Sequence, residues 1–159
     1  MLKSHINPST QAQAACNCQK SVRHERPVPG ACNQNGVIYE AIVETNDGNS
    51  ESYVGLAKNF KKRFSKHKRT LRDKKIEGQT SLSNYYWEKK DQNRNPIVTW
   101  KYLERNVPDF NPVSGLCKLC TREKFQIVLN PSVASLNHRT EMFACCRHRK
   151  TYLIGDPPD

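Results

Sequence analysis

The feature that most constrains this chain is its set of seven cysteines in a polar sequence of 159 residues. Only 36% of the residues are hydrophobic, so the chain can build one modest core and needs a further stabilising device. The cysteine count is odd, and nothing marks the chain for secretion. This combination favours metal ligands in a reducing compartment over disulfides, and zinc thiolates would supply the missing stability.

Two groups of cysteines have a spacing that suits zinc. Cys117 and Cys120 can ligate one ion from a single turn, and Cys146 and His148 follow downstream. We expect this ion to be structural, because four protein ligands leave no open position for water. Cys145 is an alternative to Cys146, and either group can instead be buried or incidental thiols. The second, less regularly spaced set of ligands is Cys16, Cys18, His24 and Cys32.

The charge predicts a polyanionic partner. Lys and Arg number 26 against 15 Asp and Glu, which gives a net charge of +11. Nucleic acid is favoured over a membrane, because no amphipathic, lipidated or long apolar segment is evident. Residues 1–15 also lack the apolar core of a secretory signal and are expected to be a flexible leader. The basic side chains expected to hold DNA phosphates are Lys58, Lys61, Lys62, Lys66, Lys68, Arg69 and Arg72.

The hydrophobic periodicity predicts a small α+β domain, an α/β/α sandwich on a short sheet. A hairpin is expected from strands over residues 36–44 and 51–55, and a third strand over 97–104. Helices are expected over residues 57–76, after a cap at Thr80 or Ser81, and from Lys118 to before Pro131. A loop over 106–116, a helix over 138–146 and an extended piece over 152–154 complete the prediction.

Several side chains are candidates for phosphate chemistry. Tyr39 and Tyr53 lie in the hairpin, where tyrosines usually pack but can also relay protons. Arg63 and His67 are four residues apart, so they share the helical face that packs on the sheet. A guanidinium held there suits phosphate recognition. Glu123 lies three residues after Cys120. A lone Glu is usually a surface residue, but a carboxylate beside an Arg and two Tyr would bind one Mg²⁺.

The ordered set of motifs resembles the GIY-YIG nuclease superfamily over about residues 36–140. The resemblance is carried by Val37-Ile38-Tyr39, Tyr53-Val54-Gly55, Arg63 with His67, Glu123 and Asn137. A closer likeness, over residues 16–154, is to the endonuclease domain of Penelope-like retroelements. It is carried by the Cys-Asn-Cys knuckle, Thr80-Ser81-Leu82-Ser83, Leu116-Cys117-Lys118-Leu119-Cys120, Ser135-Leu136-Asn137-His138-Arg139-Thr140-Glu141 and Cys146-Arg147-His148.

The resemblance implies a small central antiparallel sheet flanked by helices, and it implies roles for six residues. Tyr39 would be the general base, directly or through water, and Tyr53 would position water or phosphate. Arg63 would stabilise the phosphorane charge, with His67 beside it. The remaining two are Glu123, the metal-binding carboxylate, and Asn137, which would order the scaffold or the phosphate. Two departures are that Gly36 stands one place early, with Val37 in its slot, and that the loop between the tyrosine motifs is longer.

The implied function is a metal-dependent DNA endonuclease that nicks target DNA to prime reverse transcription of a retroelement. The expected organisation is a leader (1–15), a zinc knuckle (16–35) and an endonuclease domain (36–154). Expected cofactors are catalytic Mg²⁺ or Mn²⁺ and one or two structural Zn²⁺ ions. Expected partners are DNA, the reverse transcriptase domain of the same polyprotein and the element RNA, in the nucleus. The alternative is a zinc-stabilised nucleic-acid-binding module without catalysis.

Overall fold

The computed structural model describes residues 27–28, 32–76, 78, 80–108 and 117–138. Several predicted features lie outside these residues. They are the 1–15 leader, Cys16, Cys18, His24, the end of the 106–116 loop, Cys145, Cys146, His148, and nearly all of the 138–146 helix with the 152–154 extended piece.

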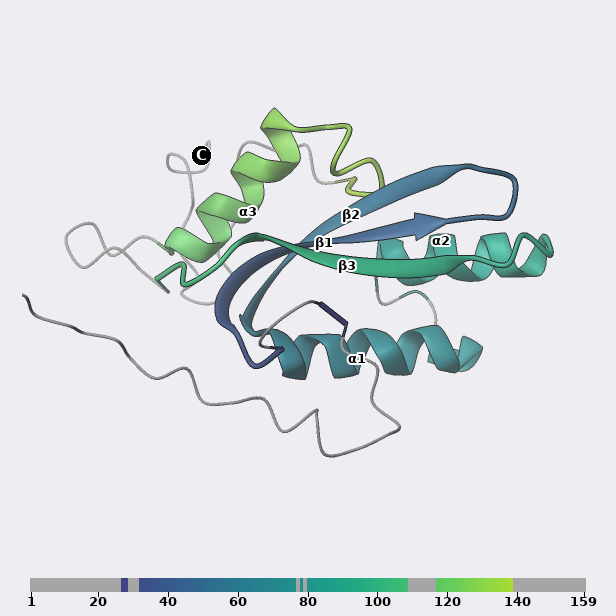
Figure 1. Cartoon of the computed structure of the whole chain (residues 1–159), viewed down its shortest axis with the longest axis horizontal. Coiled ribbons are helices and arrows are strands. Elements are labelled where there is room, and N and C mark those ends of the chain that lie inside the picture. The colour runs from purple at the N-terminus through teal and green to yellow at the C-terminus, as the bar shows by residue number, and fades with distance from the viewer. Residues whose placement is uncertain (1–26, 29–31, 77, 79, 109–116, 139–159) are drawn as a thin grey trace, which may run out of the picture.

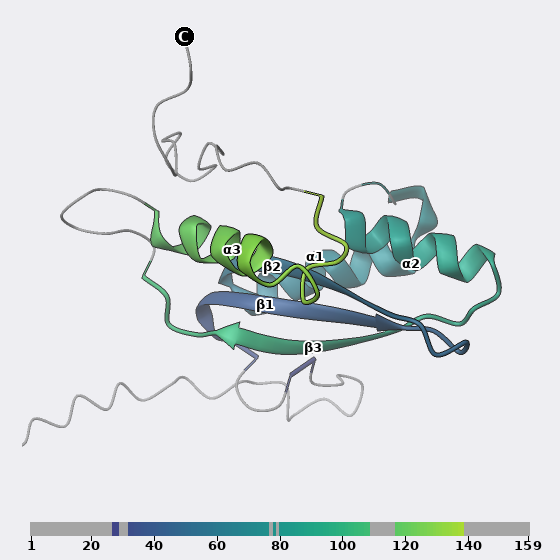
Figure 2. The same ribbon diagram turned by 90° about the horizontal axis from the view of Figure 1, so that it is seen from above.

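The sheet has three antiparallel strands, in the order β2-β1-β3. Their bounds are β1 Asn35–Glu44, β2 Ser50–Asn59 and β3 Ile97–Glu104. The predicted hairpin and third strand are confirmed. β2 extends beyond the predicted residues 51–55, because Ala57 and Asn59 still pair with β1. Figure 2 shows β1 and β3 running alongside each other for most of their length.

In the described part of the chain, three α-helices pack on the sheet: α1 Phe60–Arg72, α2 Ser81–Asp91 and α3 Lys118–Leu129. A short 3₁₀ helix, η2, covers Lys74–Ile76. α1 begins later than predicted, because the chain stays extended to Asn59. The Asn59 side chain then accepts the Lys62 N–H at 3.1 Å and caps the helix. The predicted start of α2 is confirmed, since Thr80 caps it in a reciprocal box with Ser83.

The helices cover the two faces of the sheet, as the α+β prediction requires. Alternate side chains of β1 point to opposite faces: Tyr39 and Val43 join a core with Phe60 of α1 and Leu82 of α2. Ile38 joins a second core against α3. Figure 1 shows α3 on one side of the sheet and α1 on the other. The central strand is therefore buried on both faces.

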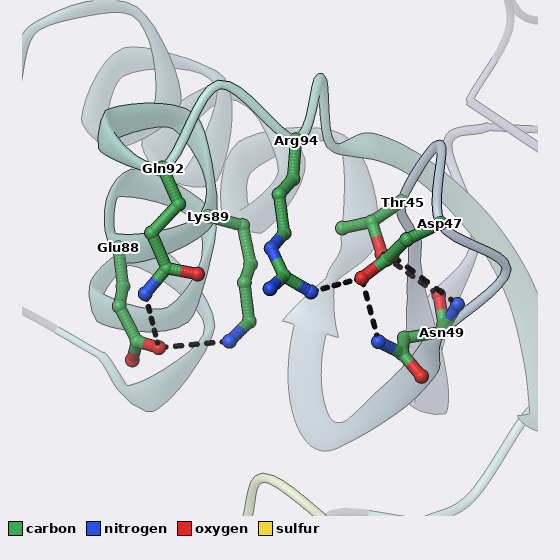
Figure 3. A network of polar contacts seen from close by, with 7 residues as sticks. All are labelled: Thr45, Asp47, Asn49, Glu88, Lys89, Gln92 and Arg94. Atoms are coloured by element: carbon green, nitrogen blue, oxygen red, sulfur yellow. Dashed lines mark hydrogen bonds and ion pairs between the residues drawn. The ribbon is translucent and has the colours of Figure 1, made fainter.

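A polar network ties the hairpin tip to the connection between α2 and β3 (Figure 3). Arg94 pairs with Asp47, and the backbone N–H of Asn46 donates to the Arg94 carbonyl at 3.0 Å. Near the end of α2, Glu88 accepts hydrogen bonds from Lys89 and from Gln92, the residue after the helix. The two contacts of Arg94 tie the turn between β1 and β2 to the residues before β3. Within the described residues, no helix is long and apolar enough to cross a membrane.

Candidate active site

The centre of the candidate site is the hydroxyl of Tyr39, in the middle of β1. Tyr39 is completely buried. Its Oη lies 2.8 Å from His67 Nε2 and accepts a hydrogen bond from Arg63 Nε at 3.1 Å. Both partners come from α1, which confirms that Arg63 and His67 share the face that packs on the sheet. The helix therefore delivers a cation and an imidazole to one buried phenol.

The donors and acceptors at this hydroxyl fix where its proton goes. Arg63 can only donate, so it occupies a lone pair of the Tyr39 oxygen. Among the described residues, the Tyr39 proton has no acceptor other than His67 Nε2. The arrangement that gives the Tyr39 proton an acceptor has Tyr39 donating to an unprotonated Nε2. His67 then carries its own proton on Nδ1.

Burial and the Arg63 charge set the protonation states. Burial, reinforced by neighbouring Tyr53, raises the pKa of Tyr39 far above its ordinary value. Burial and the adjacent Arg63 cation lower the pKa of His67 from 6.5 to about 3. Burial alone would lower the pKa of Arg63, but Tyr39 and Tyr53 outweigh it and the pKa is raised. At neutral pH the site therefore holds a neutral phenol, a neutral imidazole and one cation.

Two glycines of the hairpin stand where no side chain would fit. Gly55 of β2 pairs with Tyr39 in the sheet register. A Cβ on Gly55 would lie 2.4 Å from Tyr39 Oη, so only glycine leaves space for the ring. Gly36 has φ +55°, and a Cβ there would lie 2.2 Å from the carbonyl oxygen of Val107. Gly36, which the sequence shows one place early, thus turns the chain at the start of β1.

The structure brings the other predicted residues to the same region. The half-buried Tyr53 ring lies 6.0 Å from the His67 ring, and Tyr53 acts on the pKa of both Tyr39 and Arg63. Glu123, half-buried on α3, also contributes to the raised pKa of Tyr39. Two strands and two helices therefore supply the five side chains of the candidate site.

Asn137 supports the site from outside it. Its side-chain amide accepts the Val54 N–H and donates to the Val54 carbonyl, both at 2.8 Å. Beside it, the Leu136 N–H donates to the Ser52 carbonyl at 2.8 Å. The segment thus extends the exposed edge of β2 and holds the backbone between Tyr53 and Gly55. Of the two expected roles for Asn137, scaffold or phosphate, this geometry favours the scaffold.

Sequence reasoning missed the part played by Trp100. It predicted only a strand over residues 97–104, but the Trp100 ring packs against both Tyr39, at 5.8 Å, and His67, at 5.3 Å. The available signal was its place among the alternating apolar residues of β3. That alternation predicts a buried face, yet cannot reveal which side chains meet there.

The zinc predictions can be followed only in part. Cys117 and Cys120 are buried at the start of α3, where the Cys120 N–H donates to Cys117 Sγ at 3.4 Å. Their expected partners lie outside the described residues, and within those residues no three His, Cys, Asp or Glu gather around a metal site. Cys32 is disulfide-bonded. Because a disulfide sulfur is not a thiolate, the N-terminal zinc set stays a prediction that requires this bond to be reduced.

The basic residues expected to contact DNA lie mainly on the surface. Six of the seven are exposed, and Lys68 is half-buried. α1 carries no acidic residue, so its outer face is uniformly positive.

No protein-family model, curated protein or solved structure matches the chain.

The buried state of His67 predicts an acid-dependent loss of stability. Between about pH 6.5 and pH 3 the unfolded chain binds a proton on this residue and the folded chain does not. The free energy of unfolding should therefore fall as the pH decreases through this window. His67→Gln should lower stability at pH 7 but remove part of that slope, measured by urea unfolding from pH 7 to pH 4. The exposed His138→Gln control should keep the wild-type slope; an unchanged slope in His67→Gln would contradict the burial of a neutral His67.

Proposed function

We propose that this chain is a metal-dependent DNA endonuclease of the GIY-YIG type, which hydrolyses a phosphodiester bond. The observation that carries the proposal is the convergence of Arg63 Nε and His67 Nε2 on the buried Tyr39 hydroxyl, with Tyr53 on the same face. A core phenol needs one hydrogen-bond partner to be stable. A guanidinium and an imidazole together supply a phosphate-binding charge and a proton acceptor.

The proton transfers follow from these hydrogen bonds. Tyr39 takes a proton from the attacking water as it passes its own proton to His67 Nε2, so no standing phenolate is needed. This route suits a phenol whose pKa is strongly raised and an imidazole that is unprotonated at neutral pH. A bound phosphodiester brings negative charge next to Arg63, which favours a positive charge on His67. Tyr53, partly exposed, orients the water or the phosphate.

Arg63 and Glu123 would make two separate electrostatic contributions to the proposed reaction. Arg63 donates to the charge that develops on the phosphorane, a contribution of roughly 3–4 kcal/mol for a preorganised donor. Glu123 is the carboxylate that would hold Mg²⁺ or Mn²⁺. A single carboxylate fits an ion that keeps most of its waters, and its charge already reaches Tyr39. When bound, the ion supplies charge neutralisation at the phosphate and the leaving oxygen.

The uniformly basic face of α1 would hold the duplex by phosphate contacts that do not depend on sequence. A retroelement setting follows only from the resemblance. In a retroelement, the nick would expose a 3′-hydroxyl that primes reverse transcription. The partners would be the reverse transcriptase domain and the element RNA, in the nucleus.

The competing function is a zinc-stabilised nucleic-acid-binding module without chemistry. Net charge and cysteines favour it equally well. A binding module does not require the buried contacts of Tyr39 with Arg63 and His67, whereas the proposed nuclease does. Nicking of supercoiled plasmid with Mg²⁺, and its loss with EDTA, separates the two functions.

Removing the metal carboxylate should abolish nicking without abolishing binding. Glu123→Gln keeps the size of the side chain but loses the charge that attracts the ion, so we expect at least a hundredfold slower nicking of supercoiled plasmid. Its affinity for duplex DNA should stay within about twofold of the wild type, by anisotropy in EDTA. Glu88→Gln, an exposed change on α2, serves as the control and should nick normally. Wild-type nicking by Glu123→Gln would refute the metal assignment.

Binding should depend steeply on salt through α1. On duplex DNA, log K should fall with log salt with a slope of about −0.9 per neutralised phosphate. Replacing the exposed Lys61, Lys62 and Lys66 with Gln should flatten the slope by roughly 1 per lost contact, equally for unrelated sequences. Lys118→Gln, an exposed change on α3, should leave the slope unchanged. A triple variant with the wild-type slope would show that α1 does not face the DNA.

The cysteines at the start of α3, Cys117 and Cys120, should hold zinc. Elemental analysis of reduced protein should find one Zn per chain if only this set binds, and about two if both sets bind. Cys117→Ser should lose one equivalent and lower the melting temperature, because this thiol also caps α3. Cys145→Ser is the control, which keeps its zinc if Cys146 is the ligand. Unchanged zinc content in Cys117→Ser would exclude Cys117 as a ligand.

A further inference from the structure

A cavity beside the candidate site has no part in the chemistry above. Its volume is about 460 Å³, within the size range of small-molecule sites. Three elements build it: α1, α2 through Tyr86, and β3 through Trp100. Its aromatic walls are Phe64, Tyr86 and Trp100, its charged groups are Lys68 and Arg72, and no acidic residue is among its described lining.

α1 serves the active site and the cavity with two neighbouring stripes of side chains. Arg63 and His67 form the stripe that contacts Tyr39. Phe64 and Lys68, each one residue further along, form the stripe that lines the cavity, continued by Arg72. Lys68 and Arg72 lie about 7.5 and 13.5 Å beyond Arg63 along the helix axis, at a rise of 1.5 Å per residue. A nucleic-acid strand at Arg63 would thus reach the cavity within a few nucleotides.

The chemistry of the walls matches one class of ligand. Flat aromatic rings accept a stacked nucleobase whatever its identity. Lys68 and Arg72 can bind the phosphate attached to that base. Duplex DNA exposes its phosphates and the edges of its bases, but the flat faces of the bases stay stacked inside. A cavity that joins aromatic and cationic groups therefore suits an unpaired nucleotide.

We propose that this cavity binds an unpaired nucleotide of the DNA strand next to the cleavage site, so that the substrate class is a duplex with a single-stranded extension or branch. The proposal rests on the proposed function for its partner, DNA. Trp100 links the two sites, because its ring lines the cavity and packs against Tyr39 and His67. A base stacked in the cavity would therefore contact the same Trp100 ring that packs against Tyr39 and His67.

The test compares the binding of two probes in EDTA, where no cleavage occurs. The probes are a blunt duplex and the same duplex with a short thymidine extension, measured by fluorescence anisotropy at one fixed salt concentration. We expect wild-type protein to bind the extended probe roughly tenfold more tightly, as one stacked base allows. Tyr86→Leu keeps an apolar side chain but removes a stacking ring, so it should abolish the preference and leave blunt-duplex affinity unchanged.

Lys61→Gln is the matched control, since Lys61 lies on α1 but does not line the cavity. It should weaken both probes equally and keep the ratio between them. Competition by thymidine 5′-monophosphate that removes only the preference for the extension would support nucleotide recognition. Binding of the monophosphate without any preference for the extended duplex would overturn the assignment to a DNA strand.

Equal affinity of the wild type for both probes, or an unchanged ratio in Tyr86→Leu, would overturn the proposal. Plasmid nicking is measured separately and keeps the two proposals distinguishable. Nicking without a preference for the extension refutes only the cavity assignment. A preference without nicking supports the cavity and refutes only the nuclease.

Discussion

The rest of the structure depends on one buried hydroxyl. A phenol at zero exposure must be hydrogen-bonded, since an unsatisfied buried polar group costs about 1–3 kcal/mol. Tyr39 meets this demand through Arg63 and His67, and both lie on α1. The pairing fixes the rotation of the helix against the sheet. It also decides which basic residues of α1 face outwards and which line the adjacent cavity.

The surroundings of that hydroxyl are rigid because each neighbour has its own constraint. Gly55 faces Tyr39 across the hairpin and admits no side chain. Asn137 binds both backbone groups of Val54, so the edge strand cannot shift its register. Asn59 ends β2 and starts α1 within one residue. Such elements keep the groups of the site in place, as the electrostatic catalysis of the proposed function would require.

Local pattern predicted most elements but not their contacts. β3 follows from alternation and the start of α2 from a capping residue, and both signals act over a few positions. The predicted boundary between β2 and α1 was wrong, because the apolar period from Phe60 onwards does not show where the extended backbone ends. The Asn59 side chain, which caps α1, sets this boundary. The sequence placed Arg63 and His67 on one face. It could not show that they meet Tyr39, or that Asn137 binds Val54, because these pairs depend on how distant segments pack.

The charges of the site are relevant to the proposed phosphodiester substrate. The groups that raise the pKa of Arg63 are two phenols, Tyr39 and Tyr53, which hold the guanidinium in place without cancelling its charge while they stay protonated. Burial raises the pKa of Tyr39 and keeps it protonated, and burial together with the Arg63 charge lowers the pKa of His67 and keeps it neutral. Glu123 brings negative charge from α3, on a separate element. In the proposed reaction, Arg63 would bind the negative charge of the phosphate, and Glu123 would hold the divalent cation.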